Sequence, residues 1–371
     1  MTTDHPRDPA EGPAFVTTDH LRDPAEGPAF VTGDHLRDLA EAVRALLGAR
    51  PDALWARLEE LGFTSLTVPE RQGGSGGTLT DAAVVVREAG AAGAALPLSE
   101  ALFIAGPLLA ASGAALPAGT VTAYVGDLVA QPGPGGRWRV TGPLVRVPWL
   151  RSADHLVALV GTPDGPGTAV LPAPAGLTPG ENLAGEERDS AVLDGAEAAV
   201  TPLPPGPWRH ELELHGAAAR ALQLAGAARA VLTLTARHVA DRVQFGRPLA
   251  RFQAVQHRLA RLAADVVTVE VTADAAVAAL RDGAQDRELA VASAKAEASA
   301  LARSVAAAGH QLHGAIGFTM EHRLGACTRR LWAWREEHGN ELHWQRRCAD
   351  LARGSGDVWE LVTGEPGSRP L

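Results

Sequence analysis

The feature that most constrains the fold of this sequence is a long apolar stripe in its C-terminal third. Apolar side chains recur there at alternating intervals of three and four residues. The stripe comprises Phe252, Val255, Leu259, Leu262, Val266, Val269, Ala273, Ala276 and Leu280. This spacing places its members on one face of a single α-helix, which other helices must cover. Between residues 208 and 352 the only proline is Pro248, so the sequence predicts a helical bundle for residues 207–353.

Two blocks of different composition precede the predicted bundle. Residues 32–117 repeat apolar side chains at helical spacing, as in Leu36 and Leu39, and predict an N-terminal helical domain. Residues 118–206 carry short β-rich runs separated by glycine and proline, which is typical of a small β domain. The expected fold class is therefore mainly α with a β middle domain, followed by a short C-terminal tail at residues 354–371.

The N-terminus contains a direct repeat. Residues 2–16 and 17–31 match at fourteen of fifteen positions, and both copies are short and rich in proline and aspartate. Repeats that stack into solenoids have longer units with an apolar face, which these copies lack. We therefore expect residues 1–31 to form a disordered tail without a function of its own. The alternative is a short motif that docks on a partner.

Composition and charge exclude several classes of protein. The 371 residues are 46% hydrophobic and 21% charged, which is ordinary for globular domains and excludes a disordered or collagen-like chain. The net charge of −9 opposes binding to a phosphate backbone, so no nucleic-acid partner is expected. No apolar run approaches the roughly 20 residues that span a bilayer. Two cysteines and the lack of a signal-peptide pattern predict a cytoplasmic protein without a membrane partner.

Motifs for phosphate or metal binding are weak. The run Gln72–Gly77 is rich in glycine, but it lacks the Lys-Ser/Thr of a phosphate-binding loop. We interpret it as a loop before a helix that Thr80 or Asp81 caps. His338 and His343 are five residues apart, whereas two metal ligands on one helical face are three or four apart. No metal site is expected.

Three segments resemble signatures of one enzyme family. The segments Arg242–His257 and Gln311–His322 look like the signatures of the C-terminal bundle of acyl-CoA dehydrogenases. The segment Val68–Gly77 is similar to a Pro-Glu and Gly-Gly motif of the same family, and the resemblance covers roughly residues 35–352. It implies an N-terminal helical domain, a middle β-barrel-like domain and a C-terminal four-helix bundle. It also implies an FAD between these domains and across a subunit interface, in a homodimer, homotetramer or hetero-oligomer.

The resemblance implies a chemistry and assigns cofactor-binding residues. Members of the family dehydrogenate an acyl thioester, and a base removes the α proton while a hydride leaves the β carbon for FAD. CoA or a carrier protein carries the thioester, and an electron-transferring flavoprotein is the expected electron acceptor. By resemblance, Arg242 would bind the FAD diphosphate and Phe245 would pack against the cofactor. Gln311, with the backbone at His313 and Gly314, would meet the adenine end of a neighbouring subunit's FAD.

The catalytic base is the least regular part of the resemblance. The family's usual base lies in a turn near the end of the chain, and the aligned residue here is His338. Glu337 immediately precedes it, so a shift of one residue would restore a carboxylate, and it is our first choice. The imidazole of His338 is the second candidate. The position of an alternative base used by some members is occupied by Gly216, which has no side chain to accept a proton.

Residues expected to contact flavin in the middle domain are also replaced. After the first β-rich run the sequence reads Tyr124–Pro132 and lacks the Thr-Glu-Pro segment of the family. Arg146, Val147 and Pro148 stand where a Ser or Thr would bind flavin. Two functions therefore remain open. The chain is either a dehydrogenase in its own right or a non-catalytic or half-site subunit of a hetero-oligomeric dehydrogenase.

Overall fold

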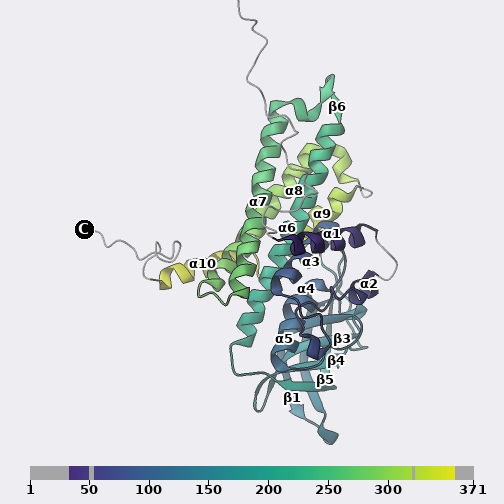
Figure 1. The fold of residues 1–371 in the computed structure, drawn as a ribbon, viewed down its shortest axis with the longest axis vertical. Coiled ribbons are helices and arrows are strands. Elements are labelled where there is room, and N and C mark those ends of the chain that lie inside the picture. The colour runs from purple at the N-terminus through teal and green to yellow at the C-terminus, as the bar shows by residue number, and fades with distance from the viewer. Residues whose placement is uncertain (1–32, 50–53, 320–321, 356–371) are drawn as a thin grey trace, which may run out of the picture.

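The computed structural model describes residues 33–49, 54–319 and 322–355, which form an elongated molecule with a helical bundle at one end and a barrel at the other (Figure 1). The predicted tail at residues 1–31 lies outside the described residues, as does all but the start of the tail at 354–371. No helix in the described ranges is long and apolar enough to cross a membrane.

Short helices make up the N-terminal part of the described chain. They are α1 (Asp34–Ala49), α2 (Leu54–Glu60), α3 (Leu79–Ala92), α4 (Leu98–Glu100) and α5 (Gly106–Ser112). Most of α3 is buried, because it packs against α1 on one side and against the first helix of the bundle on the other. This part of the chain therefore shares one apolar core with the bundle.

The start of α3 differs from the sequence prediction. The sequence suggested Thr80 or Asp81 as the N-cap, but the helix already begins at Leu79 and its cap is Thr78. The Thr78 hydroxyl accepts a hydrogen bond from the Asp81 N–H (3.1 Å), and the Asp81 carboxylate accepts one from the Thr78 N–H (2.8 Å). This reciprocal capping box satisfies two donors that a helix end otherwise leaves free. Asp81 is thus the partner of the cap, three residues further on.

The middle of the chain forms a closed β-barrel. Its strands are β1 (Val121–Pro132), β2 (Trp138–Pro148), β3 (His155–Thr162), β4 (Gly165–Pro172) and β5 (Arg188–Pro202). They close in the order β1-β2-β5-β4-β3, and β1 pairs parallel with β3 while the other pairs are antiparallel. The β-rich runs of the sequence lie in the first four strands. β5 is not predicted, because its alanines and Gly195 give it little β propensity.

The C-terminal part is a helical bundle. Its helices are α6 (Trp208–Asp241), α7 (Gln253–Arg281), α8 (Arg287–His313), α9 (Arg323–Trp334) and α10 (Glu341–Gly354). The hairpin of β6 (Val243–Gln244) and β7 (Arg247–Pro248) joins α6 to α7 at the end of the bundle remote from the barrel (Figure 1). The predicted fold class, mainly α with a barrel-like middle domain and a four-helix bundle, is confirmed.

The apolar stripe of α7 packs as its spacing predicts. From Leu262 to Leu280 its members are buried against α6 and α8. Phe252, Val255 and Leu259, at the hairpin end, are only half-buried. The core of the bundle therefore begins about two turns into α7, and the hairpin projects beyond it.

Two glycines allow α3 and α6 to cross closely. A Cβ added at Gly90 of α3 would lie 2.6 Å from the Gln223 carbonyl oxygen and 2.9 Å from its Cα. A Cβ added at Gly226 of α6 would clash with the Arg87 carbonyl oxygen. The two backbones are thus in direct contact, and any larger residue at either position must push the helices apart.

Replacing Gly226 by Ala should lower the free energy of unfolding by about 1–3 kcal/mol, because the added methyl group overpacks this crossing. Intrinsic helix propensity alone would favour alanine by roughly 1 kcal/mol. Gly48→Ala in α1 is the matched control, since a Cβ there has no atom within 4 Å, and it should be neutral or stabilising. Urea unfolding followed by circular dichroism measures both variants. Equal stability of G226A and G48A would contradict the close crossing.

Candidate functional site

A cavity of about 280 Å³ lies where the barrel meets the bundle. Its wall is formed by β1, β2 and the start of β5, by Glu100 and Ile104 of the N-terminal part, by the first half of α6 and by the turn between α9 and α10. The polar residues that line it include Tyr124, Arg146, Arg188, Arg220, Glu337 and His338. Both candidate bases from the sequence, Glu337 and His338, therefore face the same cavity.

The carboxylate of Glu337 is held by three side chains. Arg188 donates to it twice, from Nε to Oε1 and from Nη2 to Oε2, both at 2.8 Å. Asn182 Nδ2 donates to Oε1 at 3.0 Å. Arg220 Nε lies 2.9 Å from Oε2, and the Glu337 side chain is 18% exposed. Both carboxylate oxygens thus already have partners.

The ion pairs of Glu337 belong to a larger buried network. Arg220 Nη2 donates to Glu100 Oε1 at 2.7 Å, and the two side chains are 2% and 1% exposed. Arg188 Nη2 donates to Glu186 Oε2 at 3.3 Å, and Arg330 Nε donates to Glu186 Oε1 at 3.0 Å. Three arginines thus face three carboxylates. The network is electrically balanced, which is the condition for burying so many charges.

This environment makes Glu337 a weak base. Burial disfavours its ionised form, but the positive charges of Arg220 and Arg188 outweigh that effect and lower the pKa of Glu337 to about 2. A general base works best with a pKa near the working pH. The carboxylate can anchor the network, but it has little tendency to take up a proton near neutral pH.

His338 is also a weak base, for a different reason. Burial, together with the positive charge of Arg220, lowers the pKa of His338 to about 3, so the imidazole is neutral. Its backbone is left-handed, with φ of 51°, and its carbonyl accepts a hydrogen bond from Trp344 Nε1 at 2.8 Å. The ring packs on Gly216, where a Cβ would clash with it. The residue at the alternative base position therefore has to be small for His338 to fit.

The first two cofactor-binding candidates lie beyond the end of α6. Arg242 is exposed, and its guanidinium forms no ion pair with any residue of the described ranges. Its carbonyl accepts a hydrogen bond from the Leu249 N–H (2.9 Å), which closes the hairpin. Phe245 at the hairpin tip is 89% exposed and has φ of 54°. The hairpin thus carries an exposed arginine at its base and an exposed aromatic ring at its tip.

The remaining cofactor-binding candidates lie at the end of α8, next to the hairpin. His313 is buried and stacks on His238 near the end of α6, with 4.5 Å between ring centroids. Its Nδ1 donates to the Gly309 carbonyl (2.8 Å), and its Nε2 is buried without a hydrogen-bond partner in the described ranges. The amide oxygen of Gln311 accepts from Arg258, which leaves its amide N–H groups free to donate. Gly314 follows with φ of 65° and open space around its Cα.

The structure does not bring the two sets of candidates together. Arg220 and Arg242 lie in or next to the same helix, α6, about 33 Å apart at roughly 1.5 Å per residue. The cavity with Glu337 and His338 thus lies at the barrel end, and the hairpin group lies at the opposite end. The donors at the hairpin end match a diphosphate and a flat heteroaromatic group. This chain offers those donors away from its own cavity.

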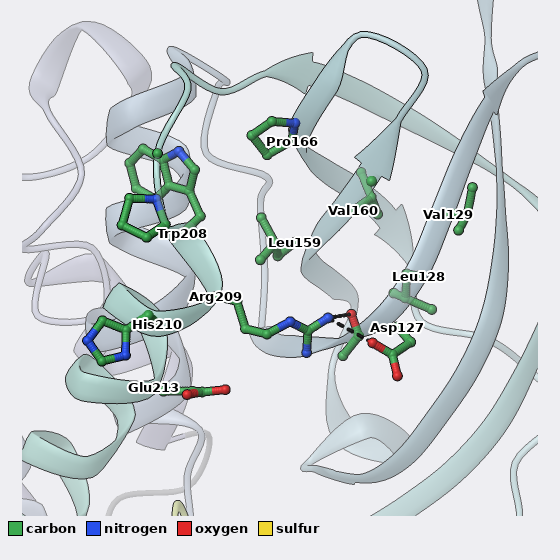
Figure 2. A pocket seen from close by; sticks show the side chains of 14 residues that line it. Asp127, Leu128, Val129, Leu159, Val160, Pro166, Trp208, Arg209, His210 and Glu213 are labelled. Atoms are coloured by element: carbon green, nitrogen blue, oxygen red, sulfur yellow. Dashed lines mark hydrogen bonds and ion pairs between the residues drawn. The ribbon is translucent and has the colours of Figure 1, made fainter. Parts of the chain in front are cut away.

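A second, more open space lies beside the first. A groove of about 620 Å³ runs between the barrel edge and the start of α6, and its apolar wall includes Leu128, Leu159 and Trp208 (Figure 2). Arg209 reaches across it and donates to Asp127 Oδ1 and to the Gly126 carbonyl, both at 2.9 Å (Figure 2). Both spaces are lined in part by Glu213, so they adjoin one another. No motif in the sequence indicates this groove.

The arginines that control the cavity were not found from the sequence. Arg188 lies 149 positions before Glu337, and Arg220 lies 120 positions after Glu100. Ion pairs of such separation leave no local pattern. The one available signal was the placement of charged residues inside otherwise apolar segments, as with Arg220 in the alanine-rich α6.

Comparison with known proteins settles the family. The model described as "Acyl-CoA dehydrogenase, C-terminal domain" matches residues 214–343, and "Acyl-CoA dehydrogenase, N-terminal domain" matches residues 30–115. Acyl-CoA dehydrogenase IpdE2 of Mycobacterium tuberculosis (strain ATCC 25618 / H37Rv) is 32% identical over 327 residues, which cover 86% of this chain and 92% of the relative. The chain belongs to the acyl-CoA dehydrogenase family. The resemblance of its motifs to this family of FAD-dependent oxidoreductases is thereby confirmed.

Solved structures of acyl-CoA dehydrogenases share the fold. One described as a Tcur3481-Tcur3483 steroid ACAD variant aligns with a TM-score of 0.75 and 27% identity, covering 88% of this chain and 99% of the other. The ChsE4-ChsE5 complex from Mycobacterium tuberculosis aligns with a TM-score of 0.73 and 22% identity, covering 91% and 99%. At 22% identity the second likeness shows the fold alone. Both descriptions name a pair of proteins.

Replacing Glu337 by Gln should lower the free energy of unfolding at pH 7 by about 3–5 kcal/mol, since Arg188 and Arg220 lose their shared carboxylate. Glu337 has a pKa depressed from 4.5 to about 2, so its stabilisation is fully present above pH 4.5 and is lost as the pH falls through 2. The gap between variant and wild type should therefore narrow below pH 4.5. Glu336→Gln, at a neighbouring side chain that is 56% exposed, is the control and should change stability little at any pH. Urea unfolding at pH 7 and between pH 5 and 3 tests this, and a constant gap would refute it.

Proposed function

We propose that this chain is one subunit of a hetero-oligomeric acyl-CoA dehydrogenase that carries out FAD-dependent α,β-dehydrogenation of an acyl thioester of CoA or a carrier protein. In this proposal the partner subunit supplies the catalytic base, and this chain supplies the residues of its hairpin end to the partner's flavin. The observation that carries the proposal is the pairing of Glu337 with Arg188 and Arg220.

The state of the two candidate bases supports a partner's base. Removal of an α proton needs a group with a free lone pair and a pKa near the working pH. Glu337 has its oxygens occupied and a pKa of about 2, and His338 has a pKa of about 3. The cavity of about 280 Å³ is also at the lower limit of the roughly 300–1,000 Å³ of ligand pockets, and much of its wall is ion-paired. This chain's own cavity therefore offers a substrate neither a free base nor much unpaired polar wall.

The hairpin end supports a role in binding FAD, which when bound would accept the hydride from the β carbon. Arg242 would bind the diphosphate through its free guanidinium, and Phe245 would cover a ring face of the cofactor. Gln311 would donate its free amide N–H groups to the adenine end. Gly314, and the backbone at His313, would let the cofactor approach the main chain closely.

The comparisons support the choice of partner and substrate. The similar Tcur3481-Tcur3483 structure is described by the names of two proteins, which favours a hetero-oligomer over a homodimer or homotetramer. The same structure is described as a steroid ACAD. We therefore propose bulky polycyclic acyl thioesters as the first substrates to assay, with an electron-transferring flavoprotein as the electron acceptor.

The test is to purify the chain alone and together with a co-expressed acyl-CoA dehydrogenase subunit from a neighbouring gene. We expect a colourless protein alone, and a yellow complex with one flavin for each pair of subunits that oxidises a thioester. In that complex Glu337→Gln should leave the rate of the chemical step unchanged in preparations that remain folded. A chain that binds flavin and turns over alone, and loses that activity on Glu337→Gln or His338→Ala, would instead be a dehydrogenase in its own right.

Replacing Arg242 by Ala should weaken FAD retention in the complex by about 1.5–3 kcal/mol, the contribution of a hydrogen bond to a charged group. Arg251→Ala removes an exposed arginine from the same region and is the control for loss of charge alone. Flavin absorbance before and after extended dialysis measures retention. Equal flavin loss from R242A and R251A would contradict the specific role of Arg242.

A further inference from the structure

Lys295 is the only lysine in the sequence, and every other residue among the 34 basic side chains is arginine. It lies in α8 and is completely buried, with 0% exposure. We infer that Lys295 is a positioning residue whose ammonium clamps the turn between α9 and α10 and so fixes Glu337 and His338 in the cavity. Nothing in the established chemistry of the site uses this residue.

The hydrogen bonds of Lys295 require all three of its protons. Nζ donates to Ser299 Oγ at 2.9 Å, to the Arg335 carbonyl at 3.0 Å and to the Gly339 carbonyl at 2.7 Å. The Ser299 hydroxyl donates its own proton to the Arg335 carbonyl at 3.1 Å, so towards Lys295 it can only accept. Three acceptors thus converge on one nitrogen. A neutral amine has only two protons, so it leaves one of the three acceptors without a donor.

An arginine could not replace this clamp. Its donors are spread over a planar fork, whereas the three acceptors here surround a single point. A guanidinium is also larger than the space that a fully buried ammonium occupies. The chemistry of the site therefore explains why a chain that otherwise uses arginine has a lysine at this one position.

The turn that Lys295 holds is conformationally demanding. His338 and Gly339 are both left-handed, with φ of 51° and 84°. This reversal of the chain is what turns the carbonyls of Arg335 and Gly339 toward the same point. Between those two carbonyls lie Glu337 and His338, whose side chains face the cavity. The clamp therefore fixes both ends of the segment that carries them.

Several charges act on the ammonium. Burial and the positive charge of Arg220 lower the pKa of Lys295 from 10.5 to about 7, while carboxylates of the turn oppose this shift. The groups that face it are Arg220 from α6 and, from the turn, Arg335, Glu336, Glu337 and His338. As the pH rises past neutrality, the clamp loses one hydrogen bond. Either Lys295 releases an acceptor, or Ser299 turns its proton to the amine and releases the Arg335 carbonyl.

The value of fixed Glu337 and His338 side chains to the complex rests on the proposed function, whereas the charge and hydrogen bonding of Lys295 can be measured on the isolated chain. Labelling of lysine with ¹³C and ¹⁵N gives a single side-chain signal, because Lys295 is the only lysine in the sequence. We expect an ammonium protected from solvent exchange that titrates near pH 7. Arg137→Lys adds a reference lysine at a side chain that is 73% exposed, and it should titrate near 10.5. Titration of both lysines near 10.5 with fast exchange would overturn the inference.

The positioning of the turn is read from Trp344, whose Nε1 donates to the His338 carbonyl. The fluorescence of Trp344 is isolated by subtracting the spectrum of the same protein with Trp344→Phe from the spectrum of the protein without that change. In the wild type this signal should change with the midpoint of the Lys295 titration. Lys295→Met should remove the step, because methionine has no proton to donate or titrate, and Lys295→Arg should not restore it. A wild-type signal constant between pH 6 and 9 would overturn the inference, even if Lys295→Met fails to fold. Neither measurement involves flavin, thioester or a partner, so its failure leaves the proposed function untouched.

Discussion

The relative placement of the three parts of this chain depends on one buried set of ion pairs. Glu100 comes from the N-terminal helices, Glu186 and Arg188 come from the barrel segment, and Arg220 and Glu337 come from the bundle. These charges are largely buried, and the pairs Arg220–Glu100 and Arg188–Glu337 join different parts of the chain. Removing any one leaves an unpaired charge at the meeting point of all three. The interaction therefore fixes the domains more than it stabilises any single one of them.

The sequence predicts the elements whose signals are local. The three-four spacing from Phe252 to Leu280 predicts a helix that the structure confirms, because burial of one helical face is a property of that segment alone. β5 and the Thr78 cap were missed. β5 is held in place by pairing with β2 and β4 rather than by its own composition, and Thr78 was overlooked because Thr80 and Asp81 look equally suitable as caps.

The sequence could name the residues of the candidate site, but it could not predict whether they can accept a proton. The resemblance to the family named Glu337 and His338 as candidate bases, and the structure places both at one cavity. Whether either group can accept a proton depends on Arg188 and Arg220, which are brought in by the fold from distant positions. A pKa is a property of the surroundings, so residue type and spacing cannot supply it. The roles of Arg242, Phe245, Gln311, His313 and Gly314 remain predictions, since they depend on a second subunit.

The helix α6 makes the two ends of the molecule mechanically interdependent. It runs unbroken from Trp208 to Asp241, with Arg220 in the ion-pair network and Arg242 just beyond its other end. A straight helix behaves as a stiff lever, and the arm between these two residues is about 33 Å. A tilt of about 3° at Arg220 would displace Arg242 by about 1.7 Å over an arm of that length. A loss of charge balance at the cavity would thus misalign the distant hairpin, although the two regions do not touch.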